Sequence, residues 1–551
     1  MKKNSKEVIA SFLAIGMLAS SGLTLTACGG GGNKVADDEN TLEIFISDFG
    51  YGTAWLDDVI AKFKNEAWVK EKYPSLNIPK VKKNSEKTYP ADSITSGTTT
   101  VDLFFSTMTA AASYEKTDAS GKYYFEDITD VYNAEVPGET ITVKDKMLPS
   151  ILSGKQYVTK AGETKYYAVP WVNGYMGLLY NETLMKEYLG NDYAVPLTTN
   201  ELVQMAKDIK AEGEVPFISA AKVDYWLYVF QTWWMQYEGA TEYENYWNGQ
   251  NKYGEYTSDI FSQQGRLEGL KVLESLISRS NGYNHTDSTT QEFTAAQSKM
   301  ILGEAVMMPN GDWFETEMRS NYAEDKNHYD IKFMKTPIIS SIVEKMDLYT
   351  HGTTKYTDLT ESERNAYDAK LQAIITAVDN GTTDSLTGVS ASDIQKIQDA
   401  RKAIIGISSH DAMIPSYAKA KGVAKDFLRF LATDSACESF MRATNGASTA
   451  FNYDVKTKNP TLYNSFSNLQ KERAEMALNG ITSTASYHSK LAYWGGLNSF
   501  AMTEMLESAF MAQSNDDRKS ATKIFQDDIT YYTANSGENW ENLLKLAGMK
   551  N

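Results

Sequence analysis

Trp171, Asn173 and Tyr175 stand close together in the stretch YYAVPWVNGYMGLLYN, residues 166–181. Flat aromatic faces and an amide are side chains that sugars commonly meet in binding sites, so the triplet indicates recognition of a small polar ligand. The alternative is a strand kink with a buried Trp, because aromatic residues are core residues by default. The stretch therefore predicts a binding protein, while a structural role for Trp171 stays open.

Two carboxylates, Asp48 and Asp312, raise the alternative of catalysis. A glycoside hydrolase needs two carboxyl groups about 5 to 10 Å apart, one of them with a raised pKa. Both aspartates, however, lie in polar sequence contexts where a carboxylate would accept hydrogen bonds from hydroxyl groups. The sequence offers no Gly-x-Ser-x-Gly, phosphate loop or metal-ligand cluster for other chemistry. We therefore expect no enzyme, with an anchored glycoside hydrolase or a carbohydrate-binding adhesin as alternatives.

The residues around Pro170 predict two strand pieces separated by a bend. Proline cannot donate to a sheet ladder, so the first strand must end or lie at an edge there. Asn173 and Gly174 tolerate unusual backbone angles, and Met176 to Tyr180 forms a second apolar run before a helix start at Asn181. This pattern is typical of a segment that passes from one lobe of a protein into another.

From residue 41 the chain reads in β-α-β order, which predicts an α/β protein with a parallel sheet. Ligands collect beyond the carboxyl ends of such strands, here at residues 47–51 and 106–108. The expected elements are a strand at Thr41–Ile46, a helix with Trp55, Val59, Ile60 and Phe63 on one stripe, a strand at Leu76–Val81 and a buried strand at Val101–Phe105.

The start of the chain resembles an export signal and is set apart from the fold. A basic beginning precedes a mostly apolar run, residues 8–25, and Leu-Thr-Ala follows directly before Cys28. This ending resembles a bacterial lipobox, which implies that residues 1–27 are removed and that Cys28 carries lipid, including palmitate. A transmembrane helix is the alternative, but the run is short, contains polar residues and is followed by no basic cluster. Residues 28–40 would then form a flexible tether.

Composition restricts the partners. The formal charge is −17, and loss of the first 27 residues, with three Lys and one Glu, leaves −19. Nucleic-acid binding needs a basic face, so no nucleic acid is expected. Cys437 alone accompanies Cys28, so no disulfide is expected within the mature chain, and five scattered His predict no metal and no cofactor. A chain of 551 residues is too long for one core and predicts two or more lobes.

Four groups of motifs occur in an order known from one family. They are SGKQYV with YYAVPW, then GLLYNETLMKEYL with PLTTNELVQMAKDIKAEG, then FTAAQSKMILGEAVMMPNGDWF, and finally IIGISSHDAMIPSYAKAKGVAKDFLRFLATDSACESF. Behind a lipobox, they resemble the extracellular solute-binding proteins of bacterial carbohydrate ABC transporters and are similar to the maltose-binding protein family. Two departures are Thr199, where the family often has Trp, and a polar insertion at residues 355–401.

The resemblance implies a two-lobed periplasmic-binding-protein-like fold of type II. Each lobe would hold a mixed sheet flanked by helices, and crossing hinge segments would join the lobes. By that pattern, lobe 1 takes residues 41–167 and 336–431, with the insertion as a surface excursion, and lobe 2 takes residues 168–335 and 432–551.

The same resemblance implies which residues contact a sugar. Trp313 would stack on a sugar ring, with Asp312 beside it accepting hydrogen bonds from hydroxyl groups. Trp233 and Trp234 lie on an expected helix, where one of two adjacent residues should face the core. The expected ligand-binding residues are Asp48, Tyr51, Ser106, Met108, Trp171, Asn173, Tyr175, Tyr225, Trp226, Tyr228, Asp312, Trp313 and Trp494.

The implied function is capture of a sugar or oligosaccharide in a cleft between the lobes and its delivery to ABC transporter permease subunits. The protein would work at the extracellular face of the bacterial cell membrane, anchored through Cys28, and we expect a monomer.

Overall fold

The computed structural model describes residues 38–48, 50–79, 82–84, 94, 97, 99–106, 124–158, 162–222, 225–324, 329–407, 410–478, 480–493, 497, 506–547 and 549–550. These residues form two compact units: unit 1 runs to Asn173 and adds residues 408–465, and unit 2 takes residues 174–407 and the chain from residue 466. The expected signal peptide, Cys28 and most of the expected tether lie outside the described residues.

Unit 1 contains a mixed sheet with short helices around it. Its strands are β1 (Ile44–Ser47), β2 (Lys82–Asn84), β3 (Leu103–Ser106), β4 (Tyr157–Val158), β5 (Thr164–Lys165), β6 (Val169–Pro170) and β11 (Asp411–Met413). Its helices are α1 (Ala54–Asn65), α2 (Ala67–Lys72), α5 (Thr129–Asn133), α6 (Val143–Lys146), α7 (Pro149–Ser153), α18 (Lys421–Leu431), α19 (Asp434–Ala443), α20 (Val455–Lys458) and α21 (Pro460–Asn464). The five-stranded sheet has the order β2-β1-β3-β11-β6, and β4 pairs with β5.

The predicted β-α-β arrangement is confirmed in unit 1. Strand β1 is parallel to both β2 and β3, and α1, between β1 and β2 in the chain, buries Trp55, Val59 and Phe63. Pro170 lies in β6, an edge strand of this sheet, as its missing N–H requires. The expected strand at Leu76–Val81 is wrong in position: the backbone at Asn77 forms only an isolated bridge, and β2 begins later, at Lys82.

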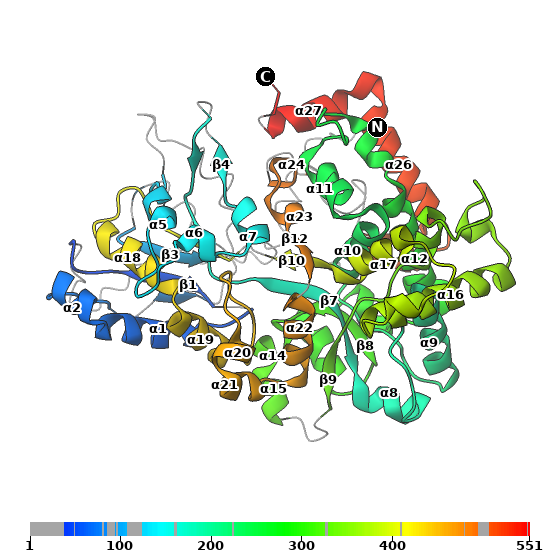
Figure 1. The fold of residues 1–551 in the computed structure, drawn as a ribbon, viewed down its shortest axis with the longest axis horizontal. Helices are drawn as coiled ribbons and strands as arrows, with labels where there is room; N and C mark the ends of the chain where they lie inside the picture. The colour runs from blue at the N-terminus through cyan, green and yellow to red at the C-terminus, as the bar shows by residue number, and fades with distance from the viewer. Residues whose placement is uncertain are drawn as a thin grey trace. The chain divides into compact units, whose positions relative to one another are not determined.

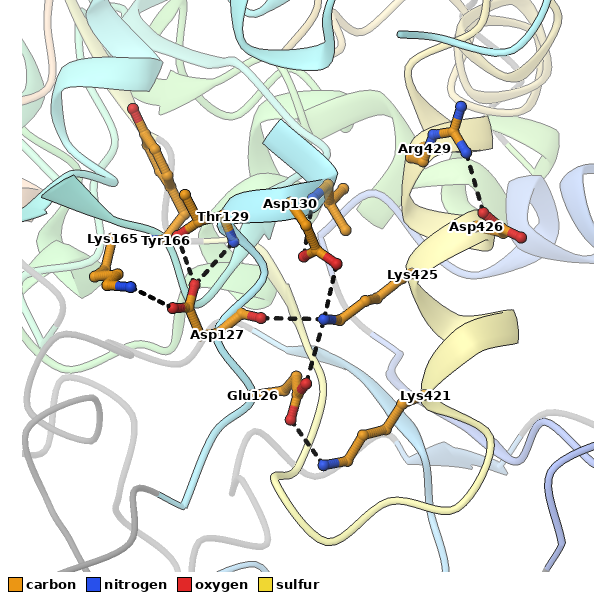
Figure 2. Close-up of polar contacts among 11 residues, drawn as sticks. Glu126, Asp127, Thr129, Asp130, Lys165, Tyr166, Lys421, Lys425, Asp426 and Arg429 are labelled. Carbon is orange, nitrogen blue, oxygen red and sulfur yellow. Dashed lines mark hydrogen bonds and ion pairs between the residues drawn. The ribbon is translucent and has the colours of Figure 1, made fainter. Parts of the chain in front are cut away.

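Ion pairs and a hydrogen bond connect α18 with residues 126–130, where the chain enters α5. The Lys425 amine lies 3.0 Å from the Asp130 carboxylate and 3.2 Å from the Glu126 carboxylate, and it donates to the Asp127 carbonyl (Figure 2). On the other side of this segment, the Asp127 carboxylate accepts a hydrogen bond from the Thr129 N–H. The Tyr166 N–H, between β5 and β6, donates to the Thr129 hydroxyl oxygen. This bond ties the chain before β6 to the start of α5.

Unit 2 is larger and is built on a second mixed sheet. Its strands are β7 (Gly174–Asn181), β8 (Met307–Gly311), β9 (Ile331–Met334), β10 (Ala403–Ile407) and β12 (Ile481–Ser483). Its helices are α8 (Glu182–Leu189), α9 (Thr199–Ala211), α10 (Leu227–Glu238), α11 (Ala240–Asn248), α12 (Gln264–Ile277), α13 (Phe293–Ile301), α14 (Phe314–Glu317), α15 (Arg319–Glu324), α16 (Glu361–Asp379), α17 (Ala391–Lys402), α22 (Asn468–Leu478), α23 (Ala485–His488), α24 (Lys490–Tyr493), α25 (Leu506–Met511), α26 (Ala521–Thr533) and α27 (Glu538–Leu546). The sheet has the order β12-β10-β7-β8, and β9 also pairs with β7.

Helix α10 lies at the centre of unit 2, against the sheet on one side and beside α12 and α17 on another (Figure 1). The expectation that only one of Trp233 and Trp234 faces the core is wrong, since both side chains are fully buried. Their indole N–H groups donate to the Pro337 carbonyl at 3.1 Å and to the Gln263 side chain at 2.8 Å. Neighbours cover most of α10, since every residue from Val229 to Tyr237 is buried.

The insertion at residues 355–401 packs into unit 2, which corrects its expected place on lobe 1. It forms α16 and α17, and Asp368 on α16 accepts hydrogen bonds from the Thr198 and Ser340 hydroxyl groups, each at 2.8 Å. Because β10 follows α17 directly and pairs with β7, residues 336–407 as a whole belong with unit 2.

The expected second lobe also needs a correction at residues 168–173 and 432–465, which fold with unit 1. Helix α19 packs against α1, and the Lys146 amine lies 2.7 Å from the Asp434 carboxylate. Thr449 forms a bridge with Val172. The chain therefore passes between the units three times, after Asn173, after β10 and after residue 465.

Candidate functional site

In unit 1, Trp171 and Tyr51 belong to one buried aromatic cluster. The Trp171 ring stacks on Trp55 with centroids 5.9 Å apart and meets Phe105 edge-to-face at 5.2 Å. Tyr51 meets His410 edge-to-face at 5.2 Å. Trp171 is 5% exposed and Tyr51 is 3% exposed, so both residues contribute to the packing of this unit. The indole N–H of Trp171 finds no hydrogen-bond partner among the described residues.

A buried ion pair lies beside this cluster. The Lys155 amine is 2.7 Å from the Asp411 carboxylate, and both side chains are almost fully buried. Burial lowers the pKa of Lys155 and raises the pKa of Asp411. For the neighbouring His410, burial lowers the pKa to about 3, and the Lys155 charge acts in the same direction. His410 is therefore a neutral imidazole at ordinary pH.

The carboxyl ends of β1 and β3 meet as the sequence predicts. The Ser47 hydroxyl donates to the Ser106 hydroxyl oxygen at 3.3 Å, and Asp48, next along the chain, is exposed. Asn173 is buried, and its N–H donates to the Ser448 carbonyl at 3.0 Å. Two other expected site residues, Met108 and Trp494, lie outside the described residues.

In unit 2, the crossing strand β7 holds Tyr175 beside the turn that follows β8. The Asp312 N–H donates to the Tyr175 carbonyl at 3.0 Å, and the Tyr175 N–H donates to the Asp312 carboxylate at 3.3 Å. Asp312 is fully buried. The antiparallel pairing of Met176 with Gly311 fixes this register, so the two sequence-predicted residues meet although 137 positions separate them.

Trp313 lies next to a pair of tyrosines. Tyr228 meets the Trp313 ring edge-to-face at 5.9 Å, and Tyr225 lies 4.9 Å from Tyr228 between ring centroids. A Cβ added at Gly311 would come within 2.1 Å of the Trp313 ring, which therefore lies directly against the Gly311 backbone. Trp313 is 7% exposed and Tyr228 is partly exposed, so part of this aromatic group reaches the surface.

Trp226, by contrast, is fully buried and meets Phe217 edge-to-face at 5.1 Å. Its backbone N–H donates to the Glu507 carboxylate at 3.3 Å, and the same carboxylate accepts a hydrogen bond from the Ser219 hydroxyl at 2.5 Å. Because α10 begins at Leu227, directly after Trp226, this buried carboxylate lies at the N-terminus of the helix, where the helix dipole favours a negative charge. Glu507 thus holds the tyrosine-bearing segment in place.

Two residues of α22 complete the surroundings of Asp312, and sequence reasoning missed both. The Gln470 side chain donates to the Asp312 carbonyl at 2.7 Å, and Arg473 Nε lies 3.6 Å from Asp312 Oδ2. The Arg473 guanidinium also lies 5.5 Å from the centre of the Tyr175 ring. Arg473 is 1% exposed. The sequence carries no signal for it, because an Arg in a polar helix is ordinarily exposed.

A cavity of about 250 Å³ opens elsewhere in unit 2, lined by residues of α9, α12 and the insertion that include Asn200, Lys271 and Tyr356. None of the sequence-predicted ligand residues lines it. The grouping of Tyr175, Asp312, Trp313, Tyr225 and Tyr228 therefore remains the candidate site in unit 2. The Trp313 and Tyr228 rings suit stacking on a sugar. Asp312, which the resemblance places as an acceptor for sugar hydroxyl groups, is instead fully buried, and its carboxylate accepts the Tyr175 N–H.

Comparison with known proteins supports the resemblance that the motifs indicate. Residues 90–341 match the family model described as bacterial extracellular solute-binding protein. No curated relative matches the chain. None of the helices in the described part of the chain combines the length and apolar character that a membrane span requires.

Solved structures show the same fold. One is from a study of xylan utilization by the thermophilic bacterium Caldanaerobius polysaccharolyticus, with TM-score 0.52, 16% identity, and 93% of this chain and 100% of that chain covered. Another is the bacterial solute receptor AcbH, described as preferring β-D-galactopyranose, with TM-score 0.56, 13% identity, and 89% and 97% covered. Maltose-bound MalE3 of T. maritima gives TM-score 0.52, 16% identity, and 89% and 98% covered. The expected fold class, a two-lobed solute-binding-protein fold with mixed sheets, is confirmed.

Proposed function

We propose that this protein is a lipid-anchored extracellular solute-binding protein that captures a sugar or oligosaccharide and delivers it to an ABC transporter permease. The observation that carries the proposal is the grouping of Trp313, Tyr228 and Tyr225 beside the Asp312–Tyr175 pair. Stacking faces next to a fixed turn are suited to a pyranose ring, which presents apolar C–H faces and a rim of hydroxyl groups. The family match over residues 90–341 supports this interpretation.

Unit 1 would contribute the polar ends of β1 and β3. Asp48 is exposed there, next to the Ser47–Ser106 contact, and a carboxylate accepts hydrogen bonds from hydroxyl groups. We propose Asp48 as a sugar contact within unit 1. Cys28 would carry the lipid anchor at the extracellular face of the cell membrane.

A thermal-shift screen tests sugar binding. The full mature chain is melted with galactose, maltose, raffinose, xylobiose and chitobiose. A ligand at 100 times its Kd adds about 2.7 kcal/mol to the free energy of unfolding, so a binding sugar raises the Tm of a chain of this length by about 2–3 °C. Absence of any shift over this panel, extended to longer oligosaccharides, would contradict the proposal.

The hydrolase alternative is tested on the same material. Labelled oligosaccharides are incubated with the protein and then separated by chromatography. We expect the sugar to be recovered intact, because a binding protein releases its ligand unchanged. Shortened products that accumulate in proportion to protein concentration would instead favour hydrolysis.

A further inference from the structure

The surroundings of Asp312 contain a buried cation that the proposed sugar contacts do not use. Arg473 comes from α22, in the last segment of the chain to join unit 2, and its Nε lies 3.6 Å from Asp312 Oδ2. Its guanidinium also lies over the Tyr175 ring at 5.5 Å. One buried side chain therefore contacts two of the residues expected at the sugar site.

Helix α22 holds the same turn through the backbone. Gln470, one helical turn before Arg473, donates to the Asp312 carbonyl at 2.7 Å, and Arg473 Nε donates to the Gln470 side-chain oxygen at 3.4 Å. The Asp312 carboxylate in turn accepts the Tyr175 N–H at 3.3 Å. The side chain and the backbone of Asp312 are thus both contacted from α22, which limits the orientations available to the following residue, Trp313.

We infer that Arg473 is a positioning residue for sugar binding, which acts through Asp312 to fix the turn that carries Trp313. The inference rests on the proposed function. A charged partner across a buried carboxylate restrains its rotation, and a stacking ring gains affinity when its orientation is set before the ligand arrives. Arg473 itself is 1% exposed and need not touch the sugar.

The chain supplies a matched control. Arg266 is also buried in unit 2, pairs with Asp528 and has a side chain that is 1% exposed. Removing either arginine takes a cation from beside a buried carboxylate, so Arg473→Met and Arg266→Met should both lower the Tm. Within the described part of the chain, Arg266 contacts Asp528 and the rings of Trp234 and Tyr246, which are not expected sugar residues. Sugar affinity should therefore change only in Arg473→Met.

A double-mutant cycle tests the route through Asp312. Titration calorimetry uses the panel sugar that gives the largest rise in Tm, with wild type, Asp312→Asn, Arg473→Met and the double variant. We expect Arg473→Met to weaken affinity about tenfold in the wild-type background and to have little further effect in the Asp312→Asn background, where the carboxylate charge is absent. Equal losses in both backgrounds, or unchanged affinity in Arg473→Met, would overturn the inference.

A second readout needs no sugar. Protein labelled with 5-fluorotryptophan is observed by fluorine NMR, and the Trp313 signal is assigned from its loss in Trp313→Phe. Arg473→Met should move the Trp313 signal, whereas Arg266→Met should leave it in place. If no sugar binds the wild type, the proposed function fails while this measurement still decides whether Arg473 positions the turn. If Arg473→Met does not fold, Arg473→Lys replaces it, because Lys keeps the charge but lacks the planar guanidinium. Arg473→Lys should shift the Trp313 signal by a smaller amount. A Trp313 signal that does not move would overturn the inference.

Discussion

Trp171 stacks on Trp55, with ring centroids 5.9 Å apart and ring planes inclined by 29°. This contact distinguishes Trp171 from Trp313, the other tryptophan that the sequence places foremost at a sugar site. Trp171 is surrounded by aromatic rings of unit 1, whereas Trp313 follows a strand end of unit 2 and meets a partly exposed tyrosine. The two residues should therefore respond differently to truncation.

Trp171→Ala should mainly reduce stability. Removal of a buried Trp leaves a cavity in the aromatic cluster, so we expect the free energy of unfolding to fall by about 3–5 kcal/mol. Urea unfolding with and without sugar measures the effect. A normal unfolding curve together with greatly weakened binding would assign Trp171 to ligand contact instead.

Trp313→Ala should mainly reduce affinity. Loss of a stacking face is worth about 1–3 kcal/mol, which weakens binding by roughly ten- to a hundredfold. Calorimetric titration with the sugar selected in the thermal screen gives the affinity, and Tyr253→Ala, a change at a tyrosine that is 75% exposed, serves as the control. Unchanged affinity with a much lower Tm would place Trp313 among the core residues.

Glu472 on α22 should make the protein less stable as pH rises towards neutrality. Burial raises its pKa from 4.5 to about 7, so the folded state holds this proton more tightly than the unfolded state. The stabilisation is present below about pH 4.5 and is lost as pH rises through 7. Glu472→Gln should match the wild type at pH 4 and gain about 1–2 kcal/mol at pH 8, a range reduced because the side chain is 34% exposed. If Glu472→Gln raised the free energy of unfolding equally at pH 4 and pH 8, the effect would come from packing and not from titration.

His410 should give the opposite pH dependence. Burial lowers its pKa from 6.5 to about 3, so the unfolded state binds the proton more tightly and stability falls as pH drops below 6.5. At pH 4 this linkage costs about 3 kcal/mol, and His410→Gln should flatten the fall between pH 7 and pH 4 by that amount. Chemical unfolding at the two pH values gives the change of the free energy of unfolding with pH. This change isolates the titration, because a loss of packing lowers the free energy of unfolding equally at both pH values. A slope identical to that of the wild type would contradict the assignment.

Cys28→Ala tests the anchor. Stable attachment to a membrane takes about two acyl chains, and Cys28 is the residue expected to carry them. The variant should remain unprocessed or lack lipid, while the wild type yields a mature N-terminus at Cys28 with the lipid mass in mass spectrometry. Cys437→Ala is the control for loss of a thiol, since that residue is buried within unit 1. Wild-type protein that begins at another residue would contradict the anchor.

Local rules predict several elements from the sequence. Pro170 indicates a strand end or edge and lies in an edge strand. Asn181 is the N-cap of α8, and its side chain accepts a hydrogen bond from the Leu184 N–H. Tyr175 and Asp312 are expected site residues on separate grounds, and the pairing of β7 with β8 brings them together. Their mutual contact depends on the register between two strands, which local patterns do not contain.

The corrections share a different cause. Arg473 escapes sequence reasoning because its partner lies 161 positions earlier, by their numbers, and α22 carries no motif. From the sequence, residues 336–407 are assigned to the wrong unit. The motif that begins IIGISSHDAM, at residue 404, contains two strands, β10 and β11, and these strands belong to different sheets. A continuous motif suggests that both strands lie in one unit, whereas their pairing partners place them in two units.

The position of β11 in the unit 1 sheet also determines when that unit can fold. β11 pairs with β3 at Asp411 and Ser106 and joins β6 to the other strands, so the sheet remains incomplete until residues 411–413 have been synthesised. The chain between Ser106 and Asp411 must be closed into a loop before these strands can pair. Closing a long loop costs conformational entropy, which slows folding. A nascent chain shorter than this should lack native unit 1 and stay open to proteases.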